Sequence, residues 1–376
     1  INEGVDQTRG WFFTLHAIAT MVFDSVAFKN VISTGLVLDA KGDKMSKHKG
    51  NVVNPFTMID KYGADPVRFY MMTNSEPWDN LKFDEKGVDK VRRKFFGTLY
   101  NTYSFFSLYA NVDDFDYSQP EVPLNERPEI DRWILSALHS LIKGVDKELG
   151  NYDPTRAGRL IDNFVNDDLS NWYVRLNRKR FWGKEMSKDK LSAYQTLYTC
   201  LETVAKLLAP FAPFYSDQLY LDLTKATGRG GEQSVHLAKY PEADESFIDS
   251  DLEIRMGMAQ KITSMVLALR RKVNIKVRQP LQAIMIPAVD DEQKNHIEAV
   301  KDLIKNEVNV KELRFVEGSG VLVKKVKCNF RTMGKKFGKL MKGIAAAMGN
   351  LSQEEISQLQ TTGSYELEVE GQKAVV

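Results

Sequence analysis

The sequence predicts a multidomain protein in which an α/β half-domain (residues 1–87) precedes an all-α helix bundle (88–248) and a small α+β domain (249–376). Three changes of pattern support this division. Apolar runs alternate with helical stretches up to about Asp84, long helical patterns begin near Val88, and short strand-like runs return after Asp249. A chain of 376 residues is also long enough for two or three domains.

In the first region, apolar residues at helical spacing predict a helix over residues 11–23. The apolar run 31–39 predicts a buried strand or one arm of a hairpin. Two further helices are expected to begin at Asn54-Pro55 and within residues 63–66, because proline is tolerated in the first turn of a helix.

The second region is dominated by apolar faces at helical spacing, the first of which runs from Phe95 to Tyr109. A polar connection with prolines (residues 113–128) separates it from the next face, Ile130 to Ile142. Further helices are expected over residues 154–179, 188–208 and 212–223. We expect four or five helices to pack as a bundle.

The third region mixes both kinds of pattern. An amphipathic helix is expected over residues 252–272, then strands at 284–286 and 313–315 with a helix over 290–305 between them. The remaining expectations are a strand over 321–326, a helix over 335–348 and a terminal strand over 365–376.

Composition restricts the class of protein. Hydrophobic residues make up 43% of the chain and the net charge is only +2, so substantial cores are expected and any affinity for nucleic acid requires local clusters of charge. No apolar run reaches the ~20 residues that span a bilayer, and no signal peptide opens the chain. The two cysteines, Cys200 and Cys328, exclude a disulfide framework and a CxxC zinc pair. We therefore expect a cytoplasmic protein, and nothing indicates an obligate assembly, so we expect a monomer.

One short loop concentrates the chemistry of phosphate binding. Lys44 and Lys47 stand three positions apart, Ser46 lies between them and Gly50 follows. Ammonium groups, a hydroxyl and a flexible backbone hold a polyphosphate by charge and hydrogen bonds together. The alternative is a solvated lysine turn, and the neighbouring sequence favours the phosphate site.

The run Lys44-Met45-Ser46-Lys47-His48 resembles the KMSKS loop of class I aminoacyl-tRNA synthetases, with histidine in the final place. Residues 3–13 resemble the adenylate-binding strand and helix start of the isoleucyl enzymes, a run that the valyl and leucyl relatives do not carry. The resemblance continues through residues 169–173, 178–180, 208–214 and 278–281. The chain is thus identified as a member of the isoleucyl-tRNA synthetase family.

This resemblance implies the C-terminal half of a Rossmann-like catalytic domain, then an anticodon-binding helix bundle, then an α+β domain that binds tRNA. It also implies isoleucine, tRNA(Ile) and ATP with Mg²⁺ as substrates, and the cysteine-poor tail implies no structural zinc. The family's His-x-Gly-His element occurs nowhere in the sequence. We therefore expect the C-terminal portion of an enzyme, without the editing domain, that binds tRNA but does not activate the amino acid alone. The alternatives are a sister enzyme for valine or leucine, and a non-catalytic RNA-binding module of the same architecture.

The resemblance assigns roles in the lysine loop. Lys47 is expected to bind ATP most directly with Lys44 as its partner, and Ser46 to donate a hydrogen bond. His48 departs from the commoner serine, and either a phosphate contact or a capping or packing role remains open for it.

At the chain start, the resemblance places Glu3, Gly4, Asp6 and Gln7 against the aminoacyl-adenylate. Carboxylates suit ribose hydroxyls or an ammonium group, and glycine permits close approach of the backbone. The alternative for Asp6 is that it caps the following helix, and both roles can hold at once. Trp11 resembles the wall of the isoleucine pocket, although a lone tryptophan is more often part of a core.

RNA contact is expected at two basic segments. In the first, aromatic residues interleave with four cations, Arg175, Arg178, Lys179 and Arg180. Arg180 and the aromatic Trp182 are the better candidates for contact. Trp172 is equally well explained as a core residue. The second has no acidic residue between its cations, which predicts a phosphate footprint and salt-sensitive binding. Its candidate residues are Lys324, Lys325, Lys327, Arg331, Lys335 and Lys336, with Lys339 and Lys342 beyond them.

Overall fold

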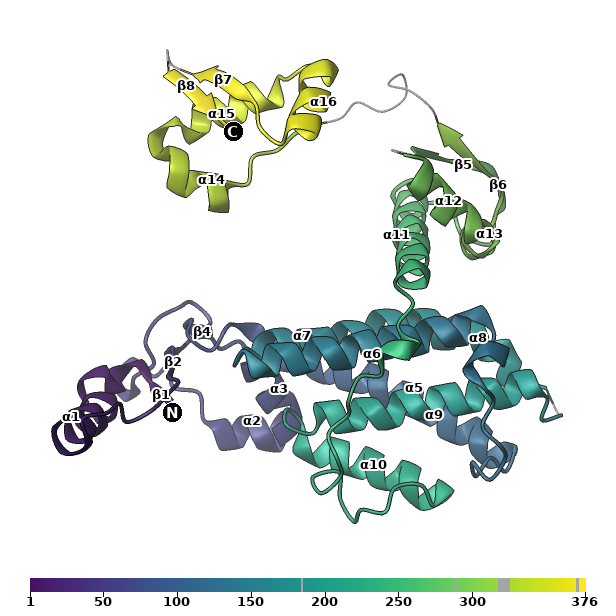
Figure 1. The fold of residues 1–376 in the computed structure, drawn as a ribbon, viewed down its shortest axis with the longest axis horizontal. Coiled ribbons are helices and arrows are strands. Elements are labelled where there is room, and N and C mark those ends of the chain that lie inside the picture. Colours follow the sequence, from purple (N-terminus) through teal and green to yellow (C-terminus); the bar gives the residue numbers. More distant parts are fainter. Residues whose placement is uncertain (184, 288–289, 317–324, 370–371) are drawn as a thin grey trace. The chain divides into compact units, whose positions relative to one another are not determined.

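The computed structural model describes residues 1–183, 185–287, 290–316, 325–369 and 372–376 (Figure 1). The chain divides into two compact units, Ile1–Glu253 and Ile254–Val376. Each is described by itself below.

The first part of unit 1 is built on two pairs of short parallel strands. β1 (Asn2–Gly4) pairs with β2 (Ile32–Thr34), and β3 (Val37–Leu38) pairs with β4 (Leu81–Lys82). Parallel neighbours need a crossover, and α1 (Trp11–Phe23) supplies it between β1 and β2, which confirms the helix predicted at residues 11–23.

Of the two interpretations of residues 31–39, the single buried strand is wrong, and the hairpin arm is met only by one antiparallel bridge between Leu38 and Lys44. The run forms β2 and β3 in separate sheets, and neither strand contains a buried residue. Gly35 causes the break because it lies against another backbone segment: its N–H donates to the Pro77 carbonyl at 2.9 Å, and an added Cβ would lie 2.2 Å from the Asp79 carbonyl oxygen. The chain can pass this point only without a side chain.

Three helices follow around a small core. Asn54 caps α2 (Pro55–Tyr62) by accepting from the Phe56 N–H at 2.9 Å, and α3 (Ala64–Asn74) and α4 (Glu85–Val91) come next. Both proline-marked helix starts are thereby confirmed. The core consists of Met58, Val67, Tyr70, Leu81, Phe83 and Val88.

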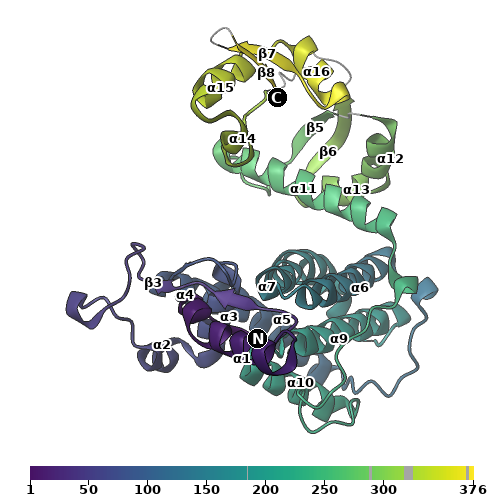
Figure 2. The same ribbon diagram turned by 60° about the vertical axis from the view of Figure 1, so that its left-hand side comes forward.

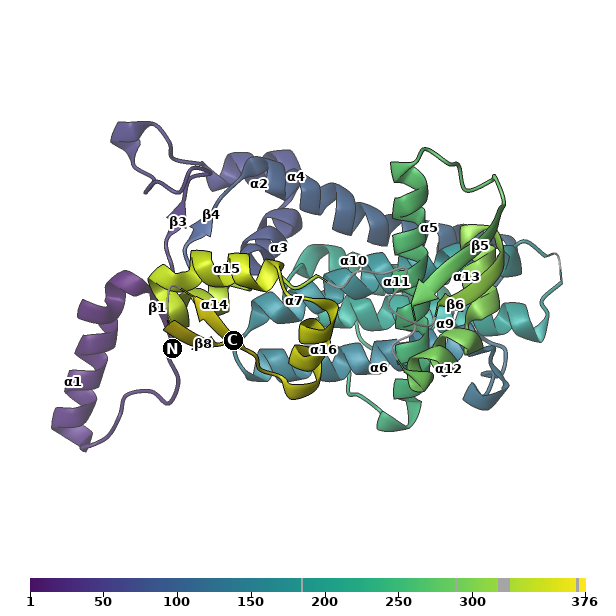
Figure 3. The same ribbon diagram turned by 90° about the horizontal axis from the view of Figure 1, so that it is seen from above.

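The rest of unit 1 is helical, as predicted (Figure 1 and Figure 3). A π-helical turn, Arg92–Phe96, leads from α4 into α5 (Gly97–Val112), and α6 (Glu129–Gly150) packs beside α7 (Pro154–Asn163). A second π-helical segment, Phe164–Val174, continues into α8 (Arg175–Asn177) and the 3₁₀ helix Arg178–Phe181. The helices α9 (Lys188–Leu208) and α10 (Pro213–Thr227) complete the bundle. Its core includes Leu99, Ile134, Leu138, Ile161, Leu169, Leu197 and Leu201.

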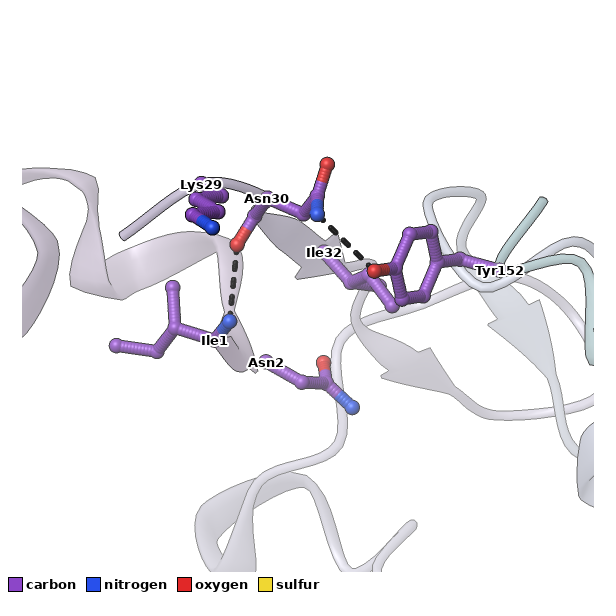
Figure 4. Close-up of a pocket in the computed structure, with 6 residues that line it drawn as sticks. All are labelled: Ile1, Asn2, Lys29, Asn30, Ile32 and Tyr152. Atoms are coloured by element: carbon purple, nitrogen blue, oxygen red, sulfur yellow. Dashed lines mark hydrogen bonds between the residues drawn. The ribbon is translucent and has the colours of Figure 1, made fainter. Parts of the chain in front are cut away.

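Polar contacts join the α/β part to the bundle. The Thr155 hydroxyl donates to the Met72 carbonyl at 2.7 Å, and the Asp65 carboxylate accepts from the Tyr215 N–H at 2.6 Å. Figure 4 shows the Asn30 amide pointing to the Tyr152 hydroxyl, to which it donates at 3.0 Å. Through these contacts, the candidate phosphate loop and the candidate RNA-binding helices belong to the same compact unit.

Unit 2 begins within α11 (Ser250–Lys272) and contains the parallel pair β5 (Leu281–Pro287) and β6 (Val310–Val316). The single helix predicted over 290–305 is two, α12 (Asp291–Ala299) and α13 (Lys301–Val308), because the chain leaves helical geometry at Val300. The Arg270 guanidinium donates to the carbonyls of Lys276, Gln279 and Asn309 at 2.9–3.1 Å, which holds the helix end to the strands.

The end of unit 2 departs from the predicted pattern in three places. The helix predicted over 335–348 is α14 (Phe330–Phe337), a 3₁₀ turn (Gly338–Leu340) and α15 (Met341–Gly349), interrupted where Gly338 takes a positive φ of 47°. After α16 (Gln353–Thr362), the predicted terminal strand is a hairpin of β7 (Glu366–Val369) and β8 (Gln372–Val375). The strand predicted over 321–326 falls largely outside the described residues, and residues 325–326 are not in a strand.

Candidate functional site

The lysine loop leaves the carboxyl end of β3 and returns to α2 at the edge of the α/β part (Figure 2). Asp39 and Asn51 close its base. The Asn51 amide donates to Asp39 Oδ2 at 2.9 Å and to the Lys44 carbonyl at 3.3 Å, while its oxygen accepts from the Ser46 N–H at 2.9 Å. Asp39 also accepts from the Asp43 N–H at 2.8 Å. The hydrogen bond from Asn51, followed by that from Asp43, lowers the pKa of the Asp39 carboxyl.

The cations of the loop face solvent. Lys44, Lys47 and His48 are exposed, and their side chains have no ion pair or hydrogen bond with any residue that the structure describes. Met45 points the other way and packs against the core around Met58. Ser46 caps the 3₁₀ turn Lys47–Lys49 by accepting from the Lys49 N–H at 3.2 Å, which leaves its hydroxyl hydrogen available. The loop therefore offers the ammonium groups of Lys44 and Lys47, unpaired within the described part of the chain, on a backbone that is already folded.

The chain start is ordered by its own side chains. Gln7 Oε1 accepts from the Trp11 N–H at 3.0 Å, and Gln7 Nε2 donates to Asp6 Oδ2 at 3.0 Å. Gln7 thus satisfies the first N–H of α1, whose N-cap is Gly10, and the alternative that Asp6 caps this helix is wrong. An added Cβ at Gly4 would lie 2.6 Å from Asp6 Oδ1, so glycine lets this carboxylate approach the backbone. Trp11 is 50% exposed, which is inconsistent with a core tryptophan in this structure.

Both candidate segments follow the carboxyl end of a strand. Glu3 and Gly4 end β1, and the loop begins directly after Leu38 of β3. Ligands of parallel α/β sheets bind at this end of the strands. Among the described residues, however, no side-chain hydrogen bond joins residues 3–11 to residues 43–51.

The first basic segment separates into exposed and buried members. Arg178, Lys179 and Trp182 are exposed, and Arg175 is exposed with its guanidinium 5.7 Å from the Trp172 ring and its Nε donating to the Asn171 carbonyl at 2.8 Å. Trp172 is only 4% exposed, which supports its interpretation as a core residue.

The structure places the Arg180 guanidinium among partners inside the protein. Its Nη1 donates to Asp131 at 2.5 Å and to Asn177 Oδ1 at 3.0 Å, and Nη2 donates to Asp131 at 2.9 Å. Nε also donates to Asp189 Oδ2 at 2.9 Å, and Nη2 donates to the Asp189 carbonyl at 2.8 Å. Burial alone would lower the pKa of Arg180, but the hydrogen bonds to Asp131 more than reverse this and raise it. A guanidinium has five N–H donors, and all five are occupied within the protein.

The second basic segment is described only in part. Lys325 and Lys327 are exposed. Lys336 donates to the Val375 carbonyl at 3.1 Å and lies 4.9 Å from the Phe337 ring, so part of its binding capacity is used internally. Lys324 lies outside the described residues, and Arg331 and Lys335 lie on α14 with side chains that are not described.

One feature of unit 1 was not anticipated from the sequence. A cleft of about 910 Å³ lies between the α3–α4 region and the π-helical segment Phe164–Val174. Its lining includes both acidic and basic side chains. Burial, and then the charge of the neighbouring Asp167, raise the pKa of the Asp162 carboxyl. The lining cations are Lys82, Lys90 and Lys94. Lys82 lies on β4, Lys90 on α4 and Lys94 in the π-helical turn, so no single helical spacing in the sequence indicates this wall.

The described residues offer neither a metal site nor a membrane span. They contain no group of three or more His, Cys, Asp or Glu side chains placed to hold a metal ion. No described helix is both long and apolar enough to cross a membrane.

Comparisons with known proteins show which family the chain resembles. Residues 1–84 match the family model "tRNA synthetases class I (I, L, M and V)", and residues 131–285 match "Anticodon-binding domain of tRNA ligase". Isoleucine–tRNA ligase of Bacteroides thetaiotaomicron is 69% identical over 100% of this chain and 32% of that protein. The Porphyromonas gingivalis enzyme is 62% identical over 99% of this chain and 32% of its own length. The Thermus thermophilus enzyme is 42% identical over 99% of this chain and 36% of its own length.

The chain thus spans about a third of the length of the curated relatives it matches. One solved structure, the ternary complex LeuRS–tRNA–LeuAMS of Agrobacterium radiobacter K84, matches over 64% of this chain and 27% of the LeuRS chain. The TM-score is 0.48 and the sequence identity 20%, so this likeness is too weak to place any residue. The chain belongs to the class I aminoacyl-tRNA synthetases. Within this class it corresponds to the C-terminal region of the isoleucine–tRNA ligases, with the end of the catalytic domain followed by the anticodon-binding domain.

Proposed function

We propose that this chain supplies the phosphate-binding loop and the tRNA-binding surface of an enzyme that joins isoleucine to tRNA(Ile) at the expense of ATP. The observation that carries the proposal is the pair of exposed ammonium groups of Lys44 and Lys47, which no described residue pairs, on a loop closed by Asp39 and Asn51.

The chemistry of activation explains why such a pair is useful. The isoleucine carboxylate attacks the α-phosphorus of ATP, and the bond to the leaving pyrophosphate breaks. Negative charge therefore builds on phosphoryl oxygens, and the protein contributes by positioning and by electrostatic stabilisation. Lys47 and Lys44 provide positive charge, the Ser46 hydroxyl a hydrogen bond and His48 a further donor, while Mg²⁺ arrives with ATP as part of the substrate.

At the chain start, the proposed ligand is the aminoacyl-adenylate. The exposed carboxylates of Glu3 and Asp6 suit hydroxyl or ammonium donors, and Gln7 retains one amide hydrogen beyond the one donated to Asp6. Gly4 keeps the backbone accessible, and the exposed ring of Trp11 is available to a side chain of isoleucine. An apolar pocket of this kind separates isoleucine from valine by only ~1–3 kcal/mol.

For tRNA, the proposed contacts are the exposed members of the two basic segments. Arg178 and Lys179 offer phosphate contacts and Trp182 a stacking face, with Arg175 beside them. In unit 2, Lys325 and Lys327 carry the same role. The proposed footprint also includes Lys324, Arg331, Lys335 and Lys336, as the sequence pattern predicts.

The test of the phosphate loop is the substitution Lys47→Ala in the full-length enzyme. Loss of one electrostatic contact to the transferring group is expected to slow ATP–pyrophosphate exchange by about 10²–10³-fold, while tRNA binding stays unchanged. Lys41→Ala is the matched control, because this exposed lysine precedes the motif in the same loop. Exchange by Lys47→Ala at the parent rate contradicts the proposal.

The 376-residue chain by itself has a separate expected behaviour. It contains no His-x-Gly-His element, so we expect it to bind tRNA(Ile) in a salt-sensitive manner and to give no ATP–pyrophosphate exchange with isoleucine. Robust exchange by this chain refutes the proposal that it carries only part of the activation site.

A monomer in a reducing cytoplasm is the proposed setting. Both cysteines are free, and burial, then the charge of Asp131, raises the pKa of the Cys200 thiol. A buried thiol of this kind is unreactive. Sedimentation of the full-length enzyme at micromolar concentration tests the monomer.

A further inference from the structure

The segment from Arg178 to Trp182 presents its side chains in two directions. Arg178, Lys179 and Trp182 are exposed, Trp182 by 57%. Between them, Phe181 is only 1% exposed and the Arg180 side chain only 14%. The two inward residues are therefore placed to hold the three outward ones.

Asp131 is the partner that anchors Arg180. It is fully buried in the first turn of α6 and accepts from both terminal nitrogens of Arg180, from the Tyr173 hydroxyl at 2.8 Å and from the Ser192 hydroxyl at 2.5 Å. The start of a helix favours a negative charge. This single carboxylate thus ties the segment to α6, to the π-helical stretch and to α9.

Contacts on the other side of Trp182 fix the backbone again. The buried Lys190 donates to the Gly183 carbonyl and pairs with Asp113 at 2.5 Å. The Phe181 ring packs edge-on against Tyr194 at 4.9 Å and against Phe105 at 5.1 Å. The residues immediately before and after the exposed Trp182, Phe181 and Gly183, are therefore both held by contacts within the protein.

We infer that Arg180, acting through Asp131, is a positioning residue that holds Arg178, Lys179 and Trp182 in the arrangement that binds RNA, without touching RNA itself. The inference rests on the proposed role of this segment in tRNA binding. Its physical basis is preorganisation, because a backbone segment that is already held in place does not lose its conformational entropy on binding. An arginine whose five donors are occupied contributes to affinity only in this indirect way.

The experiment measures tRNA(Ile) binding by the full chain across a salt series for Arg180→Lys, Asp131→Asn and the milder Tyr173→Phe. Positioning predicts that Arg180→Lys and Asp131→Asn weaken binding roughly tenfold and Tyr173→Phe about threefold, with the salt slope unchanged. A direct contact predicts the opposite sign for Asp131→Asn, because removal of the competing carboxylate frees Arg180 for phosphate. Binding by Asp131→Asn that equals or exceeds the parent overturns the inference.

Two controls separate this inference from the function on which it rests. Arg178→Ala and Lys179→Ala should each weaken binding and reduce the salt slope by about 0.7–0.9. If both bind as the parent does, the proposed RNA role of the segment fails; if they weaken binding while Arg180→Lys and Asp131→Asn do not, the positioning inference alone fails. Thermal denaturation without RNA identifies any variant that does not fold, and Tyr173→Phe, which removes one hydrogen bond, then carries the test.

Discussion

At the scale of single residues, Asn51 does more for the lysine loop than any of the lysines. Its one amide group reaches Asp39, the Lys44 carbonyl and the Ser46 N–H, and so connects both ends of the loop to its middle. Lys44 and Lys47 supply charge, but their position depends on these hydrogen bonds of Asn51.

Removal of the Asn51 hydrogen bonds gives a first prediction. In the full-length enzyme, Asn51→Ala should raise the KM for ATP by about 10-fold or more, because misplacement of a binding group by 1 Å costs up to about 10² in rate. The pKa of Asp39 should rise toward its usual value when the hydrogen bond that lowers it is removed. Exchange kinetics over a range of ATP concentrations measure the effect, and unchanged tRNA affinity serves as the control. An unaltered KM would show that the loop is held by other contacts.

Gly35 gives a second prediction at this scale. Gly35→Ala places a methyl group 2.2 Å from the Asp79 carbonyl oxygen, so the backbone must shift and the free energy of unfolding should fall by about 1–3 kcal/mol. Gly150→Ala is the matched control, since nothing lies within 4 Å of its added Cβ. Denaturant unfolding compares the two, and equal stability of both variants contradicts the proposed close approach.

At the scale of elements, α6 is tied to the segment that precedes α11 through His139. The ring of His139 stacks on Phe247 at a centroid distance of 4.5 Å, and its Nδ1 accepts from the Asp244 N–H at 3.0 Å. Burial lowers the pKa of His139, opposed by the charge of Asp244. The neutral ring is therefore the form that the folded protein prefers.

This preference predicts a pH dependence with a defined sign. Because the folded-state pKa lies below the unfolded value of about 6.5, the unfolded chain binds the proton first, and stability is lost as the pH falls from about 6.5 toward the folded-state pKa. His139→Asn keeps an acceptor near Nδ1 without titrating, so its unfolding free energy should decline less over this window. Denaturation of parent and variant at pH 7.5, 6.5 and 5.5 checks this, and parallel curves would exclude His139 as the cause.

At the scale of the whole molecule, the net charge of +2 conceals two local concentrations of cations. One is the exposed group Arg178, Lys179 and Arg175, and the other includes Lys325 and Lys327. RNA affinity follows the number of phosphates that are neutralised rather than the total charge of the protein.

The second concentration gives the last prediction. The double substitution of Lys325 and Lys327 by alanine should weaken tRNA binding and lower the salt slope by about 0.7–0.9 for each phosphate that the protein no longer neutralises. Lys373→Ala is the control, because this exposed lysine of the same unit is already paired with Glu366 at 2.6 Å. A slope equal to that of the parent would remove these lysines from the RNA footprint.

Local patterns explain how far prediction from the sequence reached. The helices beginning at Trp11, Pro55 and Ala64 follow from apolar spacing and proline placement, which act over a few residues. The family assignment came from contiguous motifs and is confirmed by a relative of 69% identity. The break at Gly35 was missed because it depends on Asp79, a residue 44 positions further along the chain.

The sequence by itself thus determined the synthetase family, the course of the main helices and the presence of a lysine loop, since each is encoded by neighbouring residues. Only the tertiary structure decided which candidate side chains remain available to a ligand. Arg180 and Trp182 look alike as candidates in the sequence, yet Arg180 is committed to Asp131, 49 residues away, while Trp182 is 57% exposed. The physical reason is that hydrogen-bond saturation and burial depend on partners that packing brings together, and no local periodicity records them.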